Sequence, residues 1–147
     1  MNPSRDTAKS PAVNVVIPSD PAEARQLQDR IEQLLQERKA HEKDVFGIRL
    51  ALEEALVNAI KHGNQMDPEK KVFVRFAIDD NHFEIVIRDE GPGFDPNDVP
   101  DPTAVENLER PCGRGLMLMR YYMTEVTYSG RGNVVTMCKV FRNNGQK

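Results

Sequence analysis

The stretch LEEALVNAIKHGN, Leu52 to Asn64, places three polar side chains inside an apolar helical pattern. Glu54, Asn58 and His62 follow one another at intervals of four residues, and side chains at that spacing lie nearly above one another on an α-helix. They would form a column beside the apolar face of the same helix. The column predicts something polar opposite this side of the helix.

Glu54 and Asn58 are a carboxylate and a carboxamide one helical turn apart. Both present acceptor oxygens toward one point, which suits an oxygen-liganded Mg²⁺ ion or a water held for proton transfer. A solvated polar stripe is the alternative for this pair. For His62 the alternative is a contact with the free carbonyl groups at the end of the helix, where Gly63 and Asn64 supply a left-handed stop.

Hydrophobic periodicity along the chain predicts an α+β protein. We expect a strand at 13–19, helices from 20 to about 39 and from 43–45 to about 62, hairpin strands at 72–78 and 83–87, a long loop at 89–115, a helix from 115 and a last strand at 133–141. This order predicts a two-layer sandwich, with helices on one face of a mixed, mainly antiparallel sheet.

The sequence DEGPG, residues 89–93, is a second candidate site. Asp89 ends a buried strand, where an unpaired carboxylate is costly, so it needs a donor such as an exocyclic amine of a ligand. Gly91 and Gly93 let the backbone pass close to a ligand. An ordinary Asp-Gly turn is the alternative.

The third candidate is Gly113-Arg114-Gly115, at the start of an apolar helix. Free backbone N–H groups at such a start suit phosphate, although G-x-G alone is weak evidence. The motif has neither the ending of a P-loop nor the third glycine of a dinucleotide fingerprint. Met117 and Met119, which follow, are expected to pack in the core.

The order of these motifs, E-x-x-x-N, then D-x-G-x-G, then G-x-G, resembles the N, G1 and G2 boxes of the GHKL ATPase superfamily from Leu50 to about Met119. The resemblance implies a histidine-kinase-like ATPase fold that binds ATP and Mg²⁺, with Asn58 on the metal and Asp89 on the adenine amine. It also implies that residues 95–110 form part of an ATP lid. The residues that it implies for nucleotide binding are Asn58, His62, Asp89, Gly91, Gly93, Gly113, Arg114, Gly115 and Leu116.

A closer resemblance, over residues 13–141, is to the small anti-sigma-factor serine/threonine kinases of bacteria. It rests on EEALVNAIKHGN, RDEGPGFDP, GRGLMLMR and the entry VVIPSDPAEARQLQDRIEQLL. Such kinases phosphorylate a serine or threonine of a STAS-type partner and sequester a sigma factor, and they form homodimers. The first strand and first helix would form the dimer surface here.

On this resemblance Glu54 takes the proton from the acceptor hydroxyl, and Arg110, with Arg114 nearby, acts on the γ-phosphate. Glu53 is the rival base, but it points about 100° away around the helix. The alternative function is an ATP-binding switch that controls a partner by complexation without phosphoryl transfer. An ATP-hydrolysing module of a larger assembly is a third possibility.

Length and composition set the broad class. The 147 residues suit one domain, which we expect at 12–142 between tails at 1–11 and 143–147. The 20 basic and 23 acidic residues nearly balance, which gives no reason to expect nucleic acid or a membrane as partner. Cys112 and Cys138 lack zinc-site spacing, and no signal peptide or membrane span is predicted, so we expect a cytoplasmic protein.

Overall fold

The structure is a computed structural model that describes residues 12–93 and 111–142. Its elements are β1 (Val13–Pro18), α2 (Pro21–Glu37), α3 (Glu42–Val57), the π-helix η1 (Asn58–Gly63), β2 (Lys71–Ile78), β3 (His82–Arg88), α4 (Pro111–Tyr122), β4 (Glu125–Ser129) and β5 (Val134–Val140). The predicted tails, and the part of the predicted lid at 95–110, lie outside the described residues.

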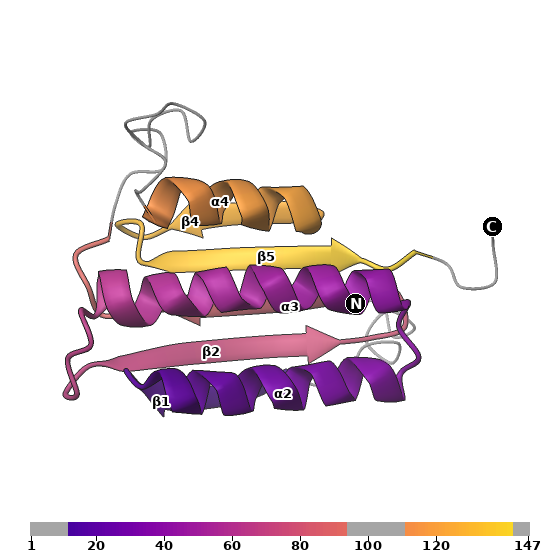
Figure 1. Cartoon of the computed structure of the whole chain (residues 1–147), viewed down its shortest axis with the longest axis horizontal. Helices are drawn as coiled ribbons and strands as arrows, with labels where there is room; N and C mark the ends of the chain where they lie inside the picture. The colour runs from indigo at the N-terminus through magenta and orange to yellow at the C-terminus, as the bar shows by residue number, and fades with distance from the viewer. Residues whose placement is uncertain (1–11, 94–110, 143–147) are drawn as a thin grey trace, which may run out of the picture.

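The five strands form one sheet in the order β1-β2-β3-β5-β4. Helices α2, α3 and α4 lie side by side on one face of this sheet, with α3 in the middle (Figure 1). The predicted α+β two-layer sandwich is confirmed. The prediction allowed for a mixed sheet, and each of the described pairings is antiparallel.

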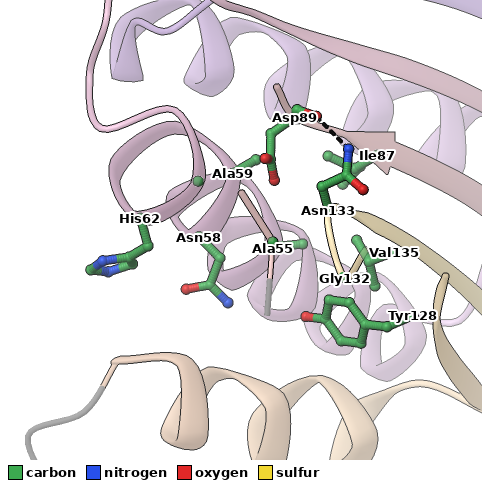
Figure 2. A pocket seen from close by; sticks show the side chains of 12 residues that line it. Ala55, Asn58, Ala59, His62, Ile87, Asp89, Tyr128, Gly132, Asn133 and Val135 are labelled. Carbon is green, nitrogen blue, oxygen red and sulfur yellow. Dashed lines mark hydrogen bonds between the residues drawn. The ribbon is translucent and has the colours of Figure 1, made fainter. Parts of the chain in front are cut away.

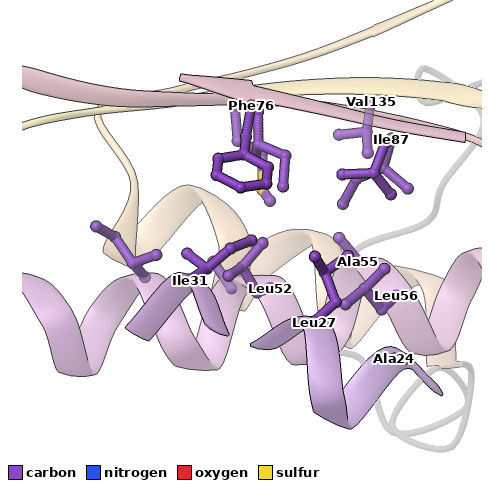
Figure 3. Packing of buried hydrophobic residues seen from close by; sticks show 14 of the residues in the cluster. Ala24, Leu27, Ile31, Leu52, Ala55, Leu56, Phe76, Ile87 and Val135 are labelled. Atoms are coloured by element: carbon purple, nitrogen blue, oxygen red, sulfur yellow. The ribbon is translucent and has the colours of Figure 1, made fainter. Parts of the chain in front are cut away.

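The hydrophobic core lies between the two layers (Figure 3). Strand β2 alternates strictly, so that one side of it is buried and the other faces away from the helices. Helix α2 buries one residue in every three or four. The side chains that meet there include Leu27, Ile31, Leu52, Leu56, Phe76 and Ile87. Full burial of each such side chain stabilises the fold by roughly 1.5–3 kcal/mol.

Helix α2 begins where the sequence predicted. Asp20 is its N-cap, since the Asp20 side chain accepts a hydrogen bond from the Ala22 N–H at 2.9 Å. Pro21 occupies the first helical position, which needs no N–H donor. The chain therefore enters the helical layer directly after β1.

The second predicted helix changes type at Asn58. The α-helix α3 ends at Val57, and the next six residues form the π-helix η1. The Asn64 N–H then donates to the Ala59 carbonyl at 2.8 Å, a bond that spans five residues. The wider turn changes which side chains share a face, so the predicted column of three polar residues does not extend regularly from Asn58 to His62.

Helix α4 begins at Pro111, four residues before the predicted start at Gly115. Proline is favoured in the first turn of a helix because it lacks an N–H that would have no partner there. Gly113 and Gly115 therefore lie within α4 and not ahead of it. The N–H of Gly115 is past the first turn, so the prediction that both glycines open the helix was wrong.

Strand β4 was missing from the sequence prediction. Its five residues, EVTYS, alternate only between exposed and half-buried positions, so they lack the clear apolar alternation of β2. The strand owes its place at the sheet edge to its pairing with β5, where Val126 lies opposite Met137 and Tyr128 lies opposite Val135. Within the described ranges, each helix is too short or too polar to cross a lipid bilayer.

Candidate functional site

A cavity of about 80 Å³ lies between η1 and the adjoining ends of β3, β4 and β5. Figure 2 shows its lining, which combines a carboxylate, two carboxamides, an imidazole and a phenol with small and apolar side chains. The lining residues are Ala55, Asn58, Ala59, His62, Gly63, Ile87, Asp89, Gly93, Tyr128, Gly132, Asn133 and Val135. Typical ligand pockets measure about 300–1,000 Å³, so the described walls enclose only part of a nucleotide-sized ligand.

Asp89 follows β3 directly, and its carboxylate points into this cavity (Figure 2). Oδ1 accepts a hydrogen bond from the Gly91 N–H at 2.8 Å. Burial raises the pKa of Asp89 above its usual 3.8, although the Gly91 N–H and the charges of Arg131 and Lys70 oppose the shift. The free protein therefore holds an incompletely solvated carboxylate that a donor from a ligand would stabilise.

Glycines 63 and 91 let η1 and the loop after β3 touch. A β-carbon on residue 63 would lie 2.5 Å from Cγ of Asp89, and one on residue 91 would lie 2.0 Å from the carbonyl oxygen of Gly63. Neither distance is possible for a real side chain. The close approach brings Asp89 against the end of the helix that carries Asn58, which joins two of the three predicted motifs.

Asn58 has the side chain most in need of a partner. Its amide nitrogen and amide oxygen are both buried, and neither has a hydrogen-bond partner among the described residues. A buried amide without partners costs about 1–3 kcal/mol, so such a group in a folded protein needs an explanation. A bound ligand or metal ion that pairs with the amide is a physical explanation for it.

Helix α4 lies against the predicted pair Glu54 and Asn58. A β-carbon on Gly115 would be 2.9 Å from Oε1 of Glu54 and 3.2 Å from Nδ2 of Asn58. Because residue 115 has no side chain, the motif Gly113-Arg114-Gly115 lies directly against the motif that contains Glu54 and Asn58. Glu54 lies one turn before Asn58 and is not among the described residues that line the cavity.

The other predicted site residues lie at the cavity rim, in the hydrophobic core, in the first turn of α4 or outside the described residues. His62 lines the cavity rim, but its side chain is exposed and its ring points away from Asp89 and Asn133 (Figure 2). Leu116 is 5% exposed and its side chain packs in the hydrophobic core. Gly113 and Arg114 belong to the first turn of α4. Arg110 lies outside the described residues.

Sequence reasoning missed the wall that β4 and β5 contribute. Asn133 donates from Nδ2 to the Asp89 carbonyl oxygen at 2.9 Å, and the Asp89 N–H donates to the Asn133 carbonyl at 3.0 Å. Nε of Arg131 donates to the Gly91 carbonyl at 2.9 Å. The signal for this wall was the segment SGRGN, a glycine-rich turn between two short strands.

The residues present fit a Mg²⁺ ion that obtains most of its ligands from elsewhere. Among residues 12–93 and 111–142, no group of three or more His, Cys, Asp or Glu side chains could hold a metal ion. Mg²⁺ commonly takes only one or two protein oxygens and completes its shell with phosphates and water. The amide of Asn58, which has no hydrogen-bond partner within the described part of the chain, offers one such oxygen.

Residues 17–139 match the protein family described as the histidine kinase-like ATPase domain, and the chain belongs to this family. The family resemblance stated from the three motifs is therefore confirmed. The chain is also similar to several named bacterial proteins. It is 40% identical over 82 residues to the anti-sigma F factor of Halalkalibacterium halodurans, a match that covers 54% of this chain and 56% of that protein.

Two further relatives carry the name serine-protein kinase RsbW. The chain is 33% identical over 105 residues to that of Bacillus licheniformis, covering 65% of this chain and 64% of the relative. It is 29% identical over 106 residues to that of Bacillus subtilis, covering 68% and 66%. The matches to these three relatives span between about half and two thirds of the relatives' own length.

A crystal structure of the RsbU and RsbW domains of a Mycobacterium tuberculosis protein has a similar fold, with a TM-score of 0.61. The similarity covers 91% of this chain and 34% of the other, at 18% sequence identity. At that identity the likeness concerns the fold alone.

Proposed function

We propose that this protein is a Mg-ATP-dependent serine/threonine kinase of the anti-sigma-factor type. The observation that carries the proposal is the buried amide of Asn58, which has no hydrogen-bond partner among the described residues and lines the same cavity as the buried carboxylate of Asp89. Membership of the histidine kinase-like ATPase family and similarity to proteins named serine-protein kinase and anti-sigma F factor support it.

In this proposal Asp89 and Asn58 bind opposite ends of the nucleotide. Oδ1 of Asp89 already accepts the Gly91 N–H, so Oδ2 is the atom that would accept the adenine amine. Asn58 would give its amide oxygen to Mg²⁺. When bound, Mg-ATP supplies the phosphoryl group and the charge that neutralises its phosphates.

Glu54 is the proposed general base. Its Oε1 lies beside Gly115 and on the same side of α3 as the Asn58 amide, so a base and a metal ligand would share one edge of the site. A carboxylate there would take the proton from the hydroxyl of the acceptor serine or threonine. Phosphoryl transfer depends mainly on position and charge neutralisation, which these few groups would supply.

The remaining nucleotide contacts are proposed for the loops and the first turns of α4. Gly91 and Gly93 would let the backbone approach the base, and His62 would lie at the rim. The backbone of α4 near Gly113, Gly115 and Leu116 would face the phosphates. Arg110 and Arg114 are the proposed cations for the γ-phosphate, because a transferring phosphoryl group needs positive charge.

The proposed partners are a STAS-type protein that accepts the phosphate and a sigma factor that the kinase sequesters in the cytoplasm. The proposed dimer uses β1 and α2. Strand β1 is an edge of the sheet, and Val16 on it is 58% exposed. An edge strand with unpaired backbone groups and apolar side chains is suited to association with a second copy.

The experiment that tests the kinase is transfer of labelled phosphate from ATP to a candidate STAS-type partner. Glu54→Gln removes the basicity of the side chain and keeps its size, so transfer should fall roughly 10²- to 10⁴-fold with ATP affinity nearly unchanged. Glu53→Gln is the matched control, because Glu53 is adjacent in sequence and exposed. This control should transfer at the wild-type rate.

Two outcomes would change the proposal. If wild-type protein binds ATP and a target protein but transfers no phosphate, the protein is an ATP-dependent binding switch and not a kinase. If Glu54→Gln and wild type transfer equally well, the kinase stands and another group is its base.

A further inference from the structure

The predicted left-handed stop does not lie at Asn64, because its φ is −82°. Asn64 is instead a buried polar residue. It follows η1 directly and is 0% exposed. Its Oδ1 accepts a hydrogen bond from the Glu90 N–H at 2.7 Å. Its Nδ2 donates to Oγ of Ser19 and to the Lys71 carbonyl oxygen, both at 3.0 Å.

Only a carboxamide meets these demands at once. The surroundings of Asn64 require one acceptor, for a backbone N–H, and two donors, for a hydroxyl oxygen and a carbonyl oxygen. The Ser19 hydroxyl cannot reverse its role easily, because it donates its own hydrogen to the Lys70 carbonyl at 2.7 Å. An aspartate would lack the donors, and an apolar residue would leave all three groups without this partner.

Asn64 also connects the two halves of the candidate site. Its N–H donates to the Ala59 carbonyl at 2.8 Å, which fixes it to the π-helix that begins with Asn58. Its side chain holds the N–H of Glu90, the residue that follows Asp89. The same helix end and loop approach each other so closely that Gly63 and Gly91 have no room for a side chain.

We infer that Asn64 is a positioning residue that aims the Asp89 carboxylate by holding the Glu90 backbone against η1, and thereby sets the site's preference for a 6-amino purine. The inference rests on the proposed ATP site. Asn64 itself does not line the cavity described above, so its effect on a ligand would pass through Asp89.

The test compares Asn64→Ala with Ser19→Ala. Asn64→Ala removes the hydrogen bond from the Glu90 N–H to Oδ1 of Asn64. Ser19→Ala removes the hydrogen bond from Nδ2 of Asn64 to the Ser19 hydroxyl, which lies on the side away from Asp89. For each, the affinities for ATP and for ITP are measured by calorimetry, because ITP carries an oxygen in place of the 6-amine. Amide hydrogen exchange at Glu90 and Gly91 is measured without nucleotide.

We expect Asn64→Ala to lower the affinity for ATP about 10-fold and to leave the affinity for ITP nearly unchanged. The reason is that a misdirected Asp89 loses one charge-assisted hydrogen bond to the 6-amine, which ITP does not have. Exchange at Glu90 and Gly91 should become faster. Ser19→Ala should keep the wild-type ATP-to-ITP ratio and the wild-type exchange at these two amides. A role in stability alone would lower the melting temperature and leave the ratio unchanged.

If Asn64→Ala does not fold, Asn64→Ser replaces it, because its hydroxyl stops one atom short of the Oδ1 position. An unchanged ATP-to-ITP ratio with unchanged exchange, or the same changes in Ser19→Ala, would overturn the inference. If wild-type protein binds neither nucleotide, the proposed function fails. Exchange at Glu90 and Gly91 then decides by itself whether Asn64 holds the loop.

Discussion

Replacing Asp89 by asparagine should change ligand affinity and protein stability in opposite directions. In the structure Oδ1 of Asp89 accepts the Gly91 N–H at 2.8 Å, and an asparagine oxygen can accept the same bond. The NH₂ group of the asparagine would then occupy the position of Oδ2. A donor would face the adenine amine, which is also a donor.

Asp89→Asn therefore loses one charge-assisted hydrogen bond to ATP. Such a bond contributes about 1.5–3 kcal/mol, so the affinity for ATP should fall roughly 10- to 100-fold. The stability of the free protein should instead rise at neutral pH. Burial raises the pKa of Asp89 above 3.8, so the ionised carboxylate opposes folding once the pH exceeds its folded-state pKa. The neutral amide that replaces the carboxylate carries no such charge.

The sign of the effect with pH follows from that shift. Because the pKa of Asp89 is raised on folding, its protonation stabilises the folded state at pH values below the unfolded pKa of about 3.8. This stabilisation is lost as the pH rises through the folded-state pKa. Asp89→Asn should thus melt above wild type at pH 7, and the difference should shrink as the pH falls toward 3.8. Differential scanning calorimetry and ATP titrations on the same samples measure both effects.

Asp79→Asn is the matched control. Asp79 is also buried, but although burial acts to raise its pKa, hydrogen bonds from the Asn81 and His82 N–H groups and the charge of His82 lower it overall. Its substitution should lower the melting temperature at pH 7 and leave ATP affinity unchanged. Unchanged ATP affinity in Asp89→Asn, or a lower melting temperature at pH 7, would refute the reasoning about Asp89.

Asn58→Ala should melt at the wild-type temperature or higher, because it removes a buried amide that has no partner among residues 12–93 and 111–142 and that costs the free protein about 1–3 kcal/mol. It should also remove the Mg²⁺ dependence of ATP binding, and an unfolded variant by circular dichroism would contradict this role. Gly115→Ala should place a methyl group 2.9 Å from Oε1 of Glu54 and slow phosphate transfer by up to about 100-fold. Wild-type transfer by this variant would show that the Glu54 position is not critical. Light scattering should give a dimer, of twice the 16.7 kDa chain mass, that Val16→Glu dissociates. A monomeric wild type at micromolar concentration would reject the β1 surface.

Local periodicity was sufficient for most of the fold. The apolar positions of α2 and the alternation of β2 each lie within a short segment, so their faces can be read without knowing what packs on them. Strand β4 was missed because its weakly alternating residues depend on β5 for their place in the sheet.

The candidate site was predictable only in pieces. Glu54, Asn58 and Asp89 stand in short motifs whose chemistry is visible in the sequence, but the motifs do not say how near they lie to one another. The change from α-helix to π-helix at Asn58 was also invisible, because no residue there breaks the helical pattern.

The contacts that assemble the site join residues far apart in the chain. Asn64 and Glu90 are 26 residues apart, and Asn133 and Asp89 are 44 apart. A carboxamide can donate to, or accept from, almost any backbone group, so its partner cannot be read from its own sequence neighbourhood. The sequence determined which chemical groups were available for a site. The packing of η1 on the loop after β3 decided which of those groups meet, because Gly63 and Gly91 let the two backbones touch there.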